Sequence, residues 1–491
     1  MRDGGCAQTK KKCVWAECVG GGGFKSSAFR GERDTFAHFL FFFADFFNMG
    51  VCPEKLTCGK RKMNKNENKN EKNNEKRFAN LKKYKVTLIF AGIALVCASI
   101  CTVCVVKILS KPVIGFYGID PATQNAICTV IENWSGEKND SKFKFKTLDS
   151  AKTLESQLFL GTKPELLFTT SGSSVKIAAH SASKNAALTS ELLAKMASSF
   201  RGAAISGKKN GTVAALPLVC GHFEISVNTT AFRNSGMKAI ATWDDIEKFL
   251  KIQKKSLSNP LIFAGKDPEV FLDLLGALTE ALDGAEEYEK ACALIEEAKE
   301  KKWKASVLAE ELCGSYNAPL YTAAKKLSEW FTQGLLSRDC FNLTGKDVNA
   351  FLKAKLSSVV FMPLYAHRTV EQDAIKRFST IYFPSERSPG TRKFTGEIIY
   401  GVPQKKNSLN SRLAQYLASE AGQEELSRAT GLAPVFAQCR TPDRQADDVR
   451  YWIAATNTPL AGLSRESDLT QKQKTELAQE LAAKIKTGNF Q

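Results

Sequence analysis

Polar side chains follow two apolar segments of the chain, at positions where buried strands would end. One segment covers residues 112–119 and the other covers residues 164–172. Because ligands of open α/β sheets lie beyond the carboxyl ends of the strands, side chains there are candidates for a ligand site. Hydroxyls and backbone N–H groups at a helix start suit a polar neutral or an anionic ligand. The candidates from these segments are Tyr117, Asp120, Thr170, Ser171 and Ser173.

A third strand pattern adds two candidates from the second half of the chain, Tyr365 and Arg368. Tyr365 could stack on the face of a sugar, although packing in the core or at a rim is an equal alternative. The candidates of the first group could likewise be ordinary turn residues. The chain has four histidines, which are His38, His180, His222 and His367. Their spacing is not that of metal ligands, so we expect no metal and no other cofactor.

Three short motifs offer a competing, enzymatic interpretation. They are Ser173–Lys176 (SSVK), Ser315–Asn317 (SYN) and Lys486–Gly488 (KTG), in the chain order found in penicillin-binding serine acyl-enzymes. In that chemistry Ser173 would be the nucleophile and Lys176 its base. Lys486, however, lies five residues from the end of the sequence within a helical pattern, which leaves no room for the strand that should carry it. We keep this enzyme as an alternative and expect that the chain is not an enzyme.

Strand and helix patterns alternate around the first candidates. The strands are expected at 112–119, 142–148 and 164–172, and the helices between them at 121–136 and 151–163. Pro121 suits an early position of the first helix, because proline is tolerated there. The order is β-α-β-α-β, which predicts the beginning of a doubly wound α/β sheet.

Three further segments carry a family resemblance. In residues 213–250 a proline-containing strand is followed by Asn228, Phe232 and the helix start Thr242-Trp-Asp-Asp, where Thr242 can cap the helix. Residues 345–365 match less well, because Ala354 stands where the pattern has glycine and a tyrosine replaces its tryptophan. Residues 397–435 end in Thr-Gly-x-x-Pro-Val. In these segments the chain resembles the extracellular solute-binding proteins of the maltose-binding type, the substrate-binding components of ABC transporters.

This resemblance implies an α/β, two-lobed periplasmic-binding-protein fold (type II) with crossover hinge strands, here preceded by one transmembrane helix. Lobe one would comprise residues 111–218 and 386–437, and lobe two residues 219–385 and 438–491. A cleft between the lobes would close around one small molecule.

The segment at 86–106 contains no charged residue and predicts a transmembrane anchor. Its 21 residues would reach about 31 Å as a helix, which matches the apolar core of a bilayer. The basic stretch before it, from Lys60 to Lys85, favours the cytoplasmic side, so the chain after Lys107 would be exported. Residues 63–85 are expected to be a disordered cytoplasmic segment, and residues 1–62 a doubtful N-terminal extension that precedes the true start.

The formal net charge of +18 does not indicate a nucleic-acid partner. Residues 1–85 contain 19 Lys and Arg against 9 Asp and Glu, whereas from residue 107 onward 50 basic residues face 42 acidic ones. No basic stripe with interleaved aromatics occurs in the exported part, so nucleic-acid binding is not expected. Six of the 14 cysteines are scattered there, and their spacing leaves any disulfide pairing open.

The sequence therefore predicts a membrane-anchored, extracytoplasmic receptor of an ABC-type importer. Its partners would be the permease subunits and a small polar solute, with a carbohydrate as the first candidate. The scarcity of tryptophan at the matched ligand positions weakens the case for an oligosaccharide without removing it. Besides the acyl-enzyme, a surface interaction protein of the same fold without a transport role remains an alternative.

Overall fold

The computed structural model describes residues 87, 89–98, 111–137, 143–161, 163–184, 186–385, 396–406, 408–436, 438–454, 460–466 and 468–490. Residues up to Cys104 and residues from Val105 form separate units. In the first unit, the described residues 89–98 are helical, and their large apolar side chains are exposed. Among the described residues, no helix has the length and apolar character needed to cross a membrane. Most of the anchor expected at 86–106, and all of residues 1–85, lie outside the described part.

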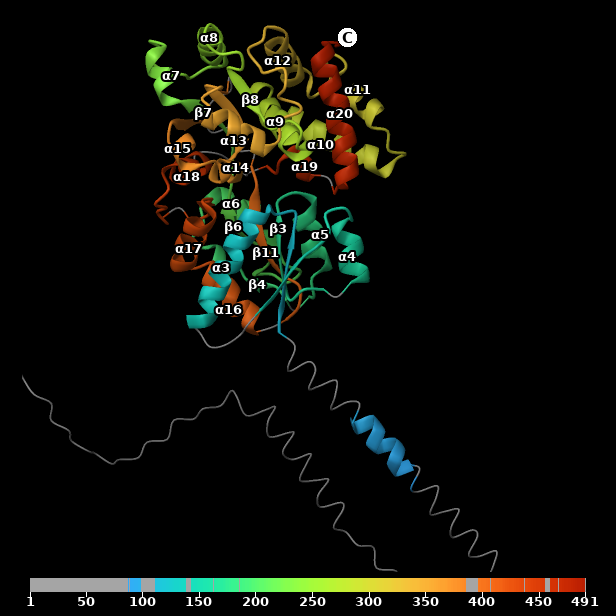
Figure 1. The fold of residues 1–491 in the computed structure, drawn as a ribbon. Coiled ribbons are helices and arrows are strands. Elements are labelled where there is room, and N and C mark those ends of the chain that lie inside the picture. The colour runs from blue at the N-terminus through green and yellow to red at the C-terminus, as the bar shows by residue number, and fades with distance from the viewer. Residues whose placement is uncertain are drawn as a thin grey trace, which may run out of the picture. The chain divides into compact units, whose positions relative to one another are not determined.

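The second unit contains two sheets (Figure 1). The first has the strand order β12-β6-β11-β3-β1-β2, with β4 and β5 also paired to β6. Its strands are β1 (Val113–Tyr117), β2 (Lys144–Thr147), β3 (Leu166–Thr170), β4 (Leu188–Thr189), β5 (Ile205–Ser206), β6 (Thr212–Cys220), β11 (Ile398–Pro403) and β12 (Ala433–Pro434). β1 runs parallel to β2 and β3, whereas β11 is antiparallel to β3 and β6. The β-α-β-α-β order expected from the sequence is present at the start of this sheet.

Helices and one short 3₁₀ turn accompany the first sheet. They are α3 (Pro121–Glu137), α4 (Leu154–Leu160), α5 (Ser173–Ser181), η1 (Ser190–Leu193), α6 (Ser198–Ala203), α16 (Ser408–Leu417), α17 (Glu420–Thr430) and α18 (Arg444–Ala454). The core between sheet and helices is apolar, and the rings of Phe116 and Phe168 stack with centroids 5.4 Å apart. Such burial of large apolar side chains is the main stabilising contribution to a domain.

The second sheet is smaller and has the order β10-β7-β9-β8. Its strands are β7 (Phe223–Asn228), β8 (Leu261–Phe263), β9 (Val359–Pro363) and β10 (Phe378–Ile381). The helices that accompany this sheet are α7 (Thr229–Asn234), α8 (Trp243–Lys254), α9 (Pro268–Leu282), α10 (Ala285–Glu300), α11 (Ala305–Cys313), α12 (Tyr321–Thr332), α13 (Gly345–Lys353), α14 (Leu364–Thr369), α15 (Gln372–Ile375) and, from the end of the chain, α19 (Leu463–Glu466) and α20 (Gln471–Thr487). A second apolar core, separate from the first, includes Phe271, Trp330 and Leu481.

Local sequence signals start and end several helices, and the helix cap expected at Thr242 is present. The Asn228 side chain accepts hydrogen bonds from two backbone N–H groups at the start of α7. Thr242 and Asp245 form a reciprocal capping box at the start of α8. α17 ends at Gly431 in the left-handed conformation (φ +68°), which glycine adopts without a Cβ penalty.

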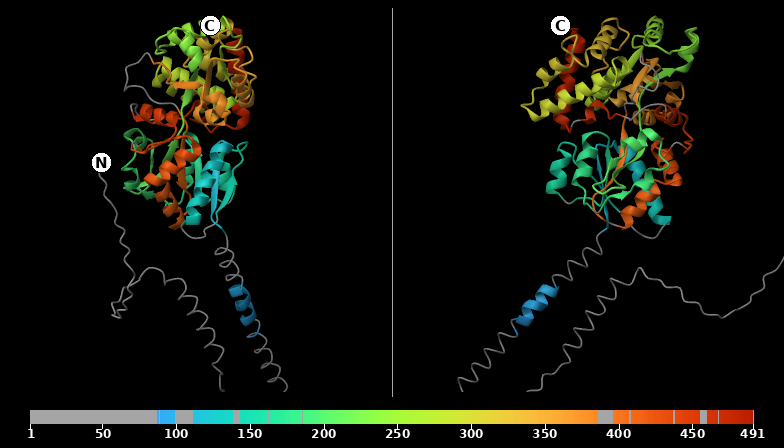
Figure 2. Two further views of the ribbon diagram at one scale, coloured as in Figure 1. Left: turned by 60° about the vertical axis from the view of Figure 1, so that its left-hand side comes forward. Right: turned by 180° about the vertical axis from the view of Figure 1, so that it is seen from behind.

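The chain crosses three times from the part that contains one sheet to the part that contains the other (Figure 2). β6 leads to β7, β10 leads to β11, and α18 leads to α19. We call lobe one the residues 111–220 with 396–454, and lobe two the residues 223–381 with 460–490. Relative to the division expected from the sequence, the structure places residues 438–454 differently, because Cys439 and Val449 are buried in the first core.

Candidate functional site

A cavity of about 710 Å³ lies between the two lobes. Lobe one contributes residues that follow β1 and β2, and lobe two contributes residues from the start of α9, from α13 and from the end of β9 into α14. We call this space the cleft cavity. Its polar lining residues are Asp120, Gln124, Thr147, Ser150, Asp267, Glu269, Asn349, Tyr365, Thr369, Arg465 and Gln471. Its volume is within the range of small-molecule sites, about 300–1,000 Å³.

Asp120 and Asp267 face the cleft cavity from opposite lobes. Oδ1 of Asp120 accepts hydrogen bonds from the backbone N–H groups of Ala122 and Thr123, both at 3.0 Å. Oδ1 of Asp267 accepts one from Glu269 at 3.0 Å, at the start of α9. Oδ2 of Asp120 is buried and has no hydrogen-bond partner among the described residues. Each aspartate thus fixes a helix start with one of its oxygens.

Arg465 is the buried cation of the site and contacts both lobes. In lobe one, Nη1 donates to the carbonyl oxygen of Gly118 at 2.8 Å and to Oγ1 of Thr170 at 3.2 Å. In lobe two, Nη2 lies 3.5 Å from a carboxylate oxygen of Glu269, and Nε lies 3.7 Å from one of Asp273. Burial disfavours the charge of this guanidinium, but the surrounding carboxylates hold its pKa above the ordinary value.

Glu397 lies beside Arg465 at the start of β11, with Oε1 3.5 Å from Nη1. Its side chain is buried, and neither carboxylate oxygen accepts a hydrogen bond from the described residues. Burial raises the pKa of Glu397 to about 7, and the charge of Arg465 offsets only part of this effect. Glu397 therefore changes its charge near neutral pH.

The structure brings only Asp120 and Tyr365 of the expected site residues into the cleft cavity. Tyr365 is the second residue of α14, which directly follows β9, and burial raises the pKa of its hydroxyl well above the ordinary value. Tyr117 is buried at the end of β1, where its hydroxyl donates to the carbonyl oxygen of Lys152 at 3.1 Å. The hydroxyl of Tyr117 is thus occupied by the chain itself.

The short helix α19 packs against the polar turn after β3. Thr170 accepts a hydrogen bond from the Arg465 side chain, and the Ser173 hydroxyl donates to the Arg465 carbonyl oxygen at 3.4 Å. Gly172 has a φ of +96°, and a Cβ there would lie 2.0 Å from the same carbonyl oxygen. The contact between this turn and α19 therefore requires glycine at position 172.

Arg368 lies away from the cleft cavity and joins α14 of lobe two to lobe one. Nε donates to the carbonyl oxygen of Gly431 at 3.0 Å, and Nη1 donates to Oε1 of Gln445 at 3.0 Å. Nη2 lies 2.5 Å from Oδ1 of Asp443. These contacts use most of the N–H donors of the guanidinium, so Arg368 links the two lobes to each other.

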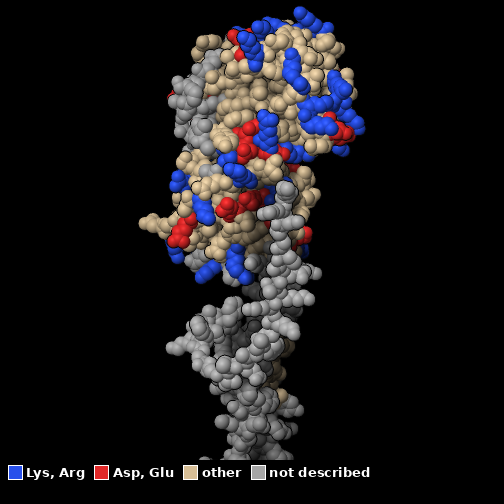
Figure 3. Space-filling view, turned by 90° about the vertical axis from the view of Figure 1, so that its left-hand side faces the viewer, with Lys and Arg blue, Asp and Glu red and all other residues tan. Residues whose placement is uncertain are grey.

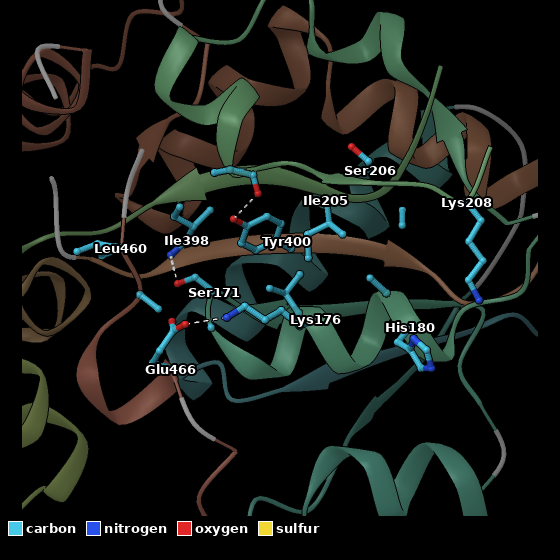
Figure 4. A pocket seen from close by; sticks show the side chains of 16 residues that line it. Ser171, Lys176, His180, Ile205, Ser206, Lys208, Ile398, Tyr400, Leu460 and Glu466 are labelled. Carbon is cyan, nitrogen blue, oxygen red and sulfur yellow. Dashed lines mark hydrogen bonds and ion pairs between the residues drawn. The ribbon is translucent and has the colours of Figure 1, made fainter. Parts of the chain in front are cut away.

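A second cavity of about 500 Å³ lies on lobe one (Figure 4). Its floor is largely apolar, and Lys176 forms an ion pair with Glu466 at 2.7 Å along its edge. Ser171 lines this second cavity and bonds to the backbone of Gly396 and Ile398. Lobe two contributes only the segment around Leu460 and Glu466 to this second cavity. Closure of the lobes would therefore enclose a ligand less completely there than in the cleft cavity.

Several site residues had no sequence signal strong enough to identify them. Asp267 directly precedes Pro268, a helix-start pattern after a buried strand, and this signal could have suggested it. The sequence around Arg465 and Glu397 shows no pattern typical of a ligand site. Both residues come into the site because the chain crosses between the lobes shortly before them. The six cysteines of this unit that the structure describes are free thiols, four of them buried and two, Cys128 and Cys292, partly buried.

The acyl-enzyme alternative is not supported by the local structure. Lys486 and Thr487 belong to the last turn of α20, which Gly488 ends in the left-handed conformation. The strand that this enzyme requires at the Lys-Thr-Gly motif is therefore a helix end. Among the described residues, no group of His, Cys, Asp and Glu has the arrangement of a metal site.

Comparison with known proteins gives matches only among solved structures; no family model and no curated protein sequence matches. A chitin oligosaccharide binding protein is similar, with a TM-score of 0.56 and 16% identity over 77% of this chain and 94% of that one. The solute-binding protein RafE in complex with raffinose gives 0.53 and 14% over 77% and 99%. A sugar transporter protein of Bacillus licheniformis in complex with stachyose gives 0.51 and 13% over 77% and 98%.

The chain has the two-lobed fold of solute-binding proteins. The fold implied by the sequence resemblance is thereby confirmed, as a mixed α/β fold with two sheets. At these low identities the likeness concerns the fold alone. The ligand has to be inferred from the cavity and its side chains.

Proposed function

We propose that this chain is the membrane-anchored, extracytoplasmic solute receptor of an ABC-type importer, with a carbohydrate as its ligand. The observation that supports this most directly is the cleft cavity, which is lined from both lobes of a solute-binding fold. Solved structures of the same fold include a chitin oligosaccharide binding protein and proteins in complex with raffinose and with stachyose. The permease subunits of the importer are the proposed membrane partners, and permease genes beside the gene for this chain would support them.

Binding would work through closure of the lobes. Asp120 of lobe one and Asn349 and Tyr365 of lobe two line the same cavity, so a solute can contact both lobes together. Hydroxyl groups of a sugar can donate to the carboxylate, and the tyrosine ring can pack on the apolar face of the sugar ring. Because both sets of contacts form only when the lobes approach, the solute shifts the equilibrium toward the closed state.

The test is calorimetric titration of the full chain with raffinose, stachyose and chitin oligosaccharides. Tyr365→Ala should weaken the binding of whichever sugar binds by about tenfold, because it removes a stacking surface from the cavity. Tyr316→Ala is the matched control, since Tyr316 is 78% exposed and does not line the cavity. Absence of binding by every sugar, or equal effects of the two substitutions, would contradict the proposal.

The proposed anchor is the uncharged segment at 86–106, with the basic stretch before it in the cytoplasm. In intact cells with two membranes, external protease should leave residues 107–491 uncut, and opening the outer membrane should expose them. A tag inserted at residue 70 should stay protected in both conditions. Digestion of that tag from outside would contradict the orientation.

A further inference from the structure

The charges that line the cleft cavity are unequal. The lining contains the carboxylates of Asp120, Asp267 and Glu269 but a single cation, Arg465. No lysine and no tryptophan belongs to this lining. Because charged groups are costly to bury without a partner of opposite charge, the excess of carboxylates restricts the ligands that the cavity accepts.

The nearby cations are already engaged by other carboxyl groups. Arg465 contacts Glu269, Asp273 and Glu397 at 3.5–3.7 Å. Lys474 lies 2.6 Å from the second oxygen of Glu269. The two cations, Arg465 and Lys474, are thus shared among three carboxyl groups, and this count does not yet include Asp120 and Asp267. The charge of Arg465 is not available to a ligand anion.

Asp120 and Asp267 have no ion-pair partner among the described residues. Each caps a helix, and the positive end of a helix corresponds to only about half an elementary charge. Burial, followed by the charge of Glu269, raises the pKa of Asp267, and the backbone N–H groups at the start of α9 and the charge of Arg465 offset only part of this effect. Oδ2 of Asp120 is buried without a hydrogen-bond donor. Both carboxyl groups would gain from a ligand that brings a positive charge and N–H donors.

We propose that the solute carries a protonated amine, held by Asp120 from lobe one and by Asp267 from lobe two. This inference rests on the proposed function and narrows it, because the ligand class becomes an amino sugar. The ammonium group supplies the missing positive charge, and charge-assisted hydrogen bonds to a carboxylate are about twice as strong as neutral ones. Tyr365, which also lines the cavity, offers a ring face for the sugar.

Two disaccharides that differ only in acetylation provide the probes: the chitin disaccharide, with acetamide groups, and its fully deacetylated form, with amines. Calorimetric titration of the full chain at slightly acidic pH, where the amines are protonated, measures both affinities. We expect the deacetylated form to bind at least about tenfold more tightly, which is a difference of about 1.4 kcal/mol.

Asp120→Asn and Asp267→Asn remove the charge while keeping a side-chain oxygen for the helix cap, since asparagine caps helices as well as aspartate. In either variant the preference for the deacetylated form should fall to near unity. Asp245→Asn is the control, because Asp245 caps α8 outside the cavity and should leave the preference as in the unsubstituted chain. Circular dichroism of each variant verifies folding, and the two aspartates test the inference independently.

The outcomes separate the two levels of the proposal. Equal affinity for the two disaccharides, tighter binding of the acetylated one, or a preference that survives both substitutions would overturn the amine assignment and leave the carbohydrate receptor in place. If these disaccharides, raffinose and stachyose all fail to bind, the carbohydrate function itself is wrong, and the amine assignment falls with it.

Discussion

Arg465 shows how one side chain can connect two lobes from a position far along the chain. It reaches Gly118 and Thr170 in one lobe and Glu269 and Asp273 in the other. A buried cation with several carboxylate partners costs more to remove than an exposed ion pair, because removal leaves the partners buried and uncompensated.

Arg465→Met should therefore lower the free energy of unfolding by about 3–5 kcal/mol, the usual cost of breaking a buried ion pair. Methionine keeps much of the side-chain length but removes the charge. Urea unfolding of the full chain followed by circular dichroism measures the change. Arg440→Met, at an exposed arginine, is the control and should change stability by less than about 0.5 kcal/mol. Equal stability of the two variants would show that Arg465 does not hold the lobes.

The raised pKa of Glu397 predicts that the stability of the chain depends on pH. Its pKa is raised from 4.5 to about 7 in the folded chain, so between these values the folded state keeps a proton that the unfolded state has lost. Unfolding then releases a proton, and the stability contributed by Glu397 falls as the pH rises from 4.5 through 7. At about 1.4 kcal/mol per pKa unit, the loss is about 3 kcal/mol.

Glu397→Gln should remove this part of the pH dependence. Between pH 5 and pH 8, the variant should gain about 2.5 kcal/mol in stability relative to the unsubstituted chain, as measured by urea unfolding at each pH. Glu425→Gln is the control, because Glu425 is the same residue type and lies away from the cavity. Parallel pH profiles for the chain and Glu397→Gln would contradict the raised pKa.

At the scale of single elements, α14 joins the lobes through Arg368. The contacts of this arginine to Gly431, Asp443 and Gln445 connect α14 with the end of α17 and the start of α18. Gly431 leaves no space for a side chain there, because a Cβ would lie 2.4 Å from Nε of Arg368. α14 and the end of α17 therefore pack closely on either side of the Arg368 guanidinium.

Arg368→Ala should lower the free energy of unfolding by about 1–3 kcal/mol, the range for lost hydrogen bonds to a charged group, and should change sugar affinity less than Tyr365→Ala does. The reason is that Arg368 does not line the cleft cavity. Urea unfolding and calorimetric titration of the same preparations measure both effects. A variant of unchanged stability that no longer binds sugar would instead make Arg368 a ligand residue, as its sequence position suggested.

Local signals explain which elements could be predicted from the sequence. The capping residues at Asn228 and Thr242 and the helix-ending Gly431 act on neighbouring backbone groups, so their residue types alone indicate where helices begin and end. Thr170 ends β3 and Ser173 begins α5, so the strand-to-helix turn expected there from the sequence is present. That α19 covers them follows from contacts about 290 residues apart, which no local pattern encodes.

At the scale of the whole molecule, the distribution of charge on the surface bears on the kind of ligand that can approach. On the face drawn in Figure 3, Lys and Arg are scattered among acidic and uncharged residues instead of forming a continuous stripe. The positive net charge of the sequence is thus not concentrated on that face. The carboxylates of the cleft cavity further disfavour a polyanionic ligand there.

The two lobes should approach each other when the solute binds. Spin labels introduced as unnatural amino acids at the exposed positions Glu155 in lobe one and Lys346 in lobe two avoid the native cysteines and report the distance across the cleft by pulsed electron resonance. With saturating sugar the distance distribution should shift to shorter values and narrow, because contacts from both lobes stabilise the closed state.

The control for this closure is the same label pair in the Tyr365→Ala chain, in which the shift should require about tenfold more sugar. Closure depends on the difference in affinity between the open and closed states, so a weaker contact in lobe two reduces the closed fraction at a given concentration. A label distance that stays constant although calorimetry records binding would mean that the solute binds to one lobe alone, or in the second cavity on lobe one, and that the cleft cavity is not the site.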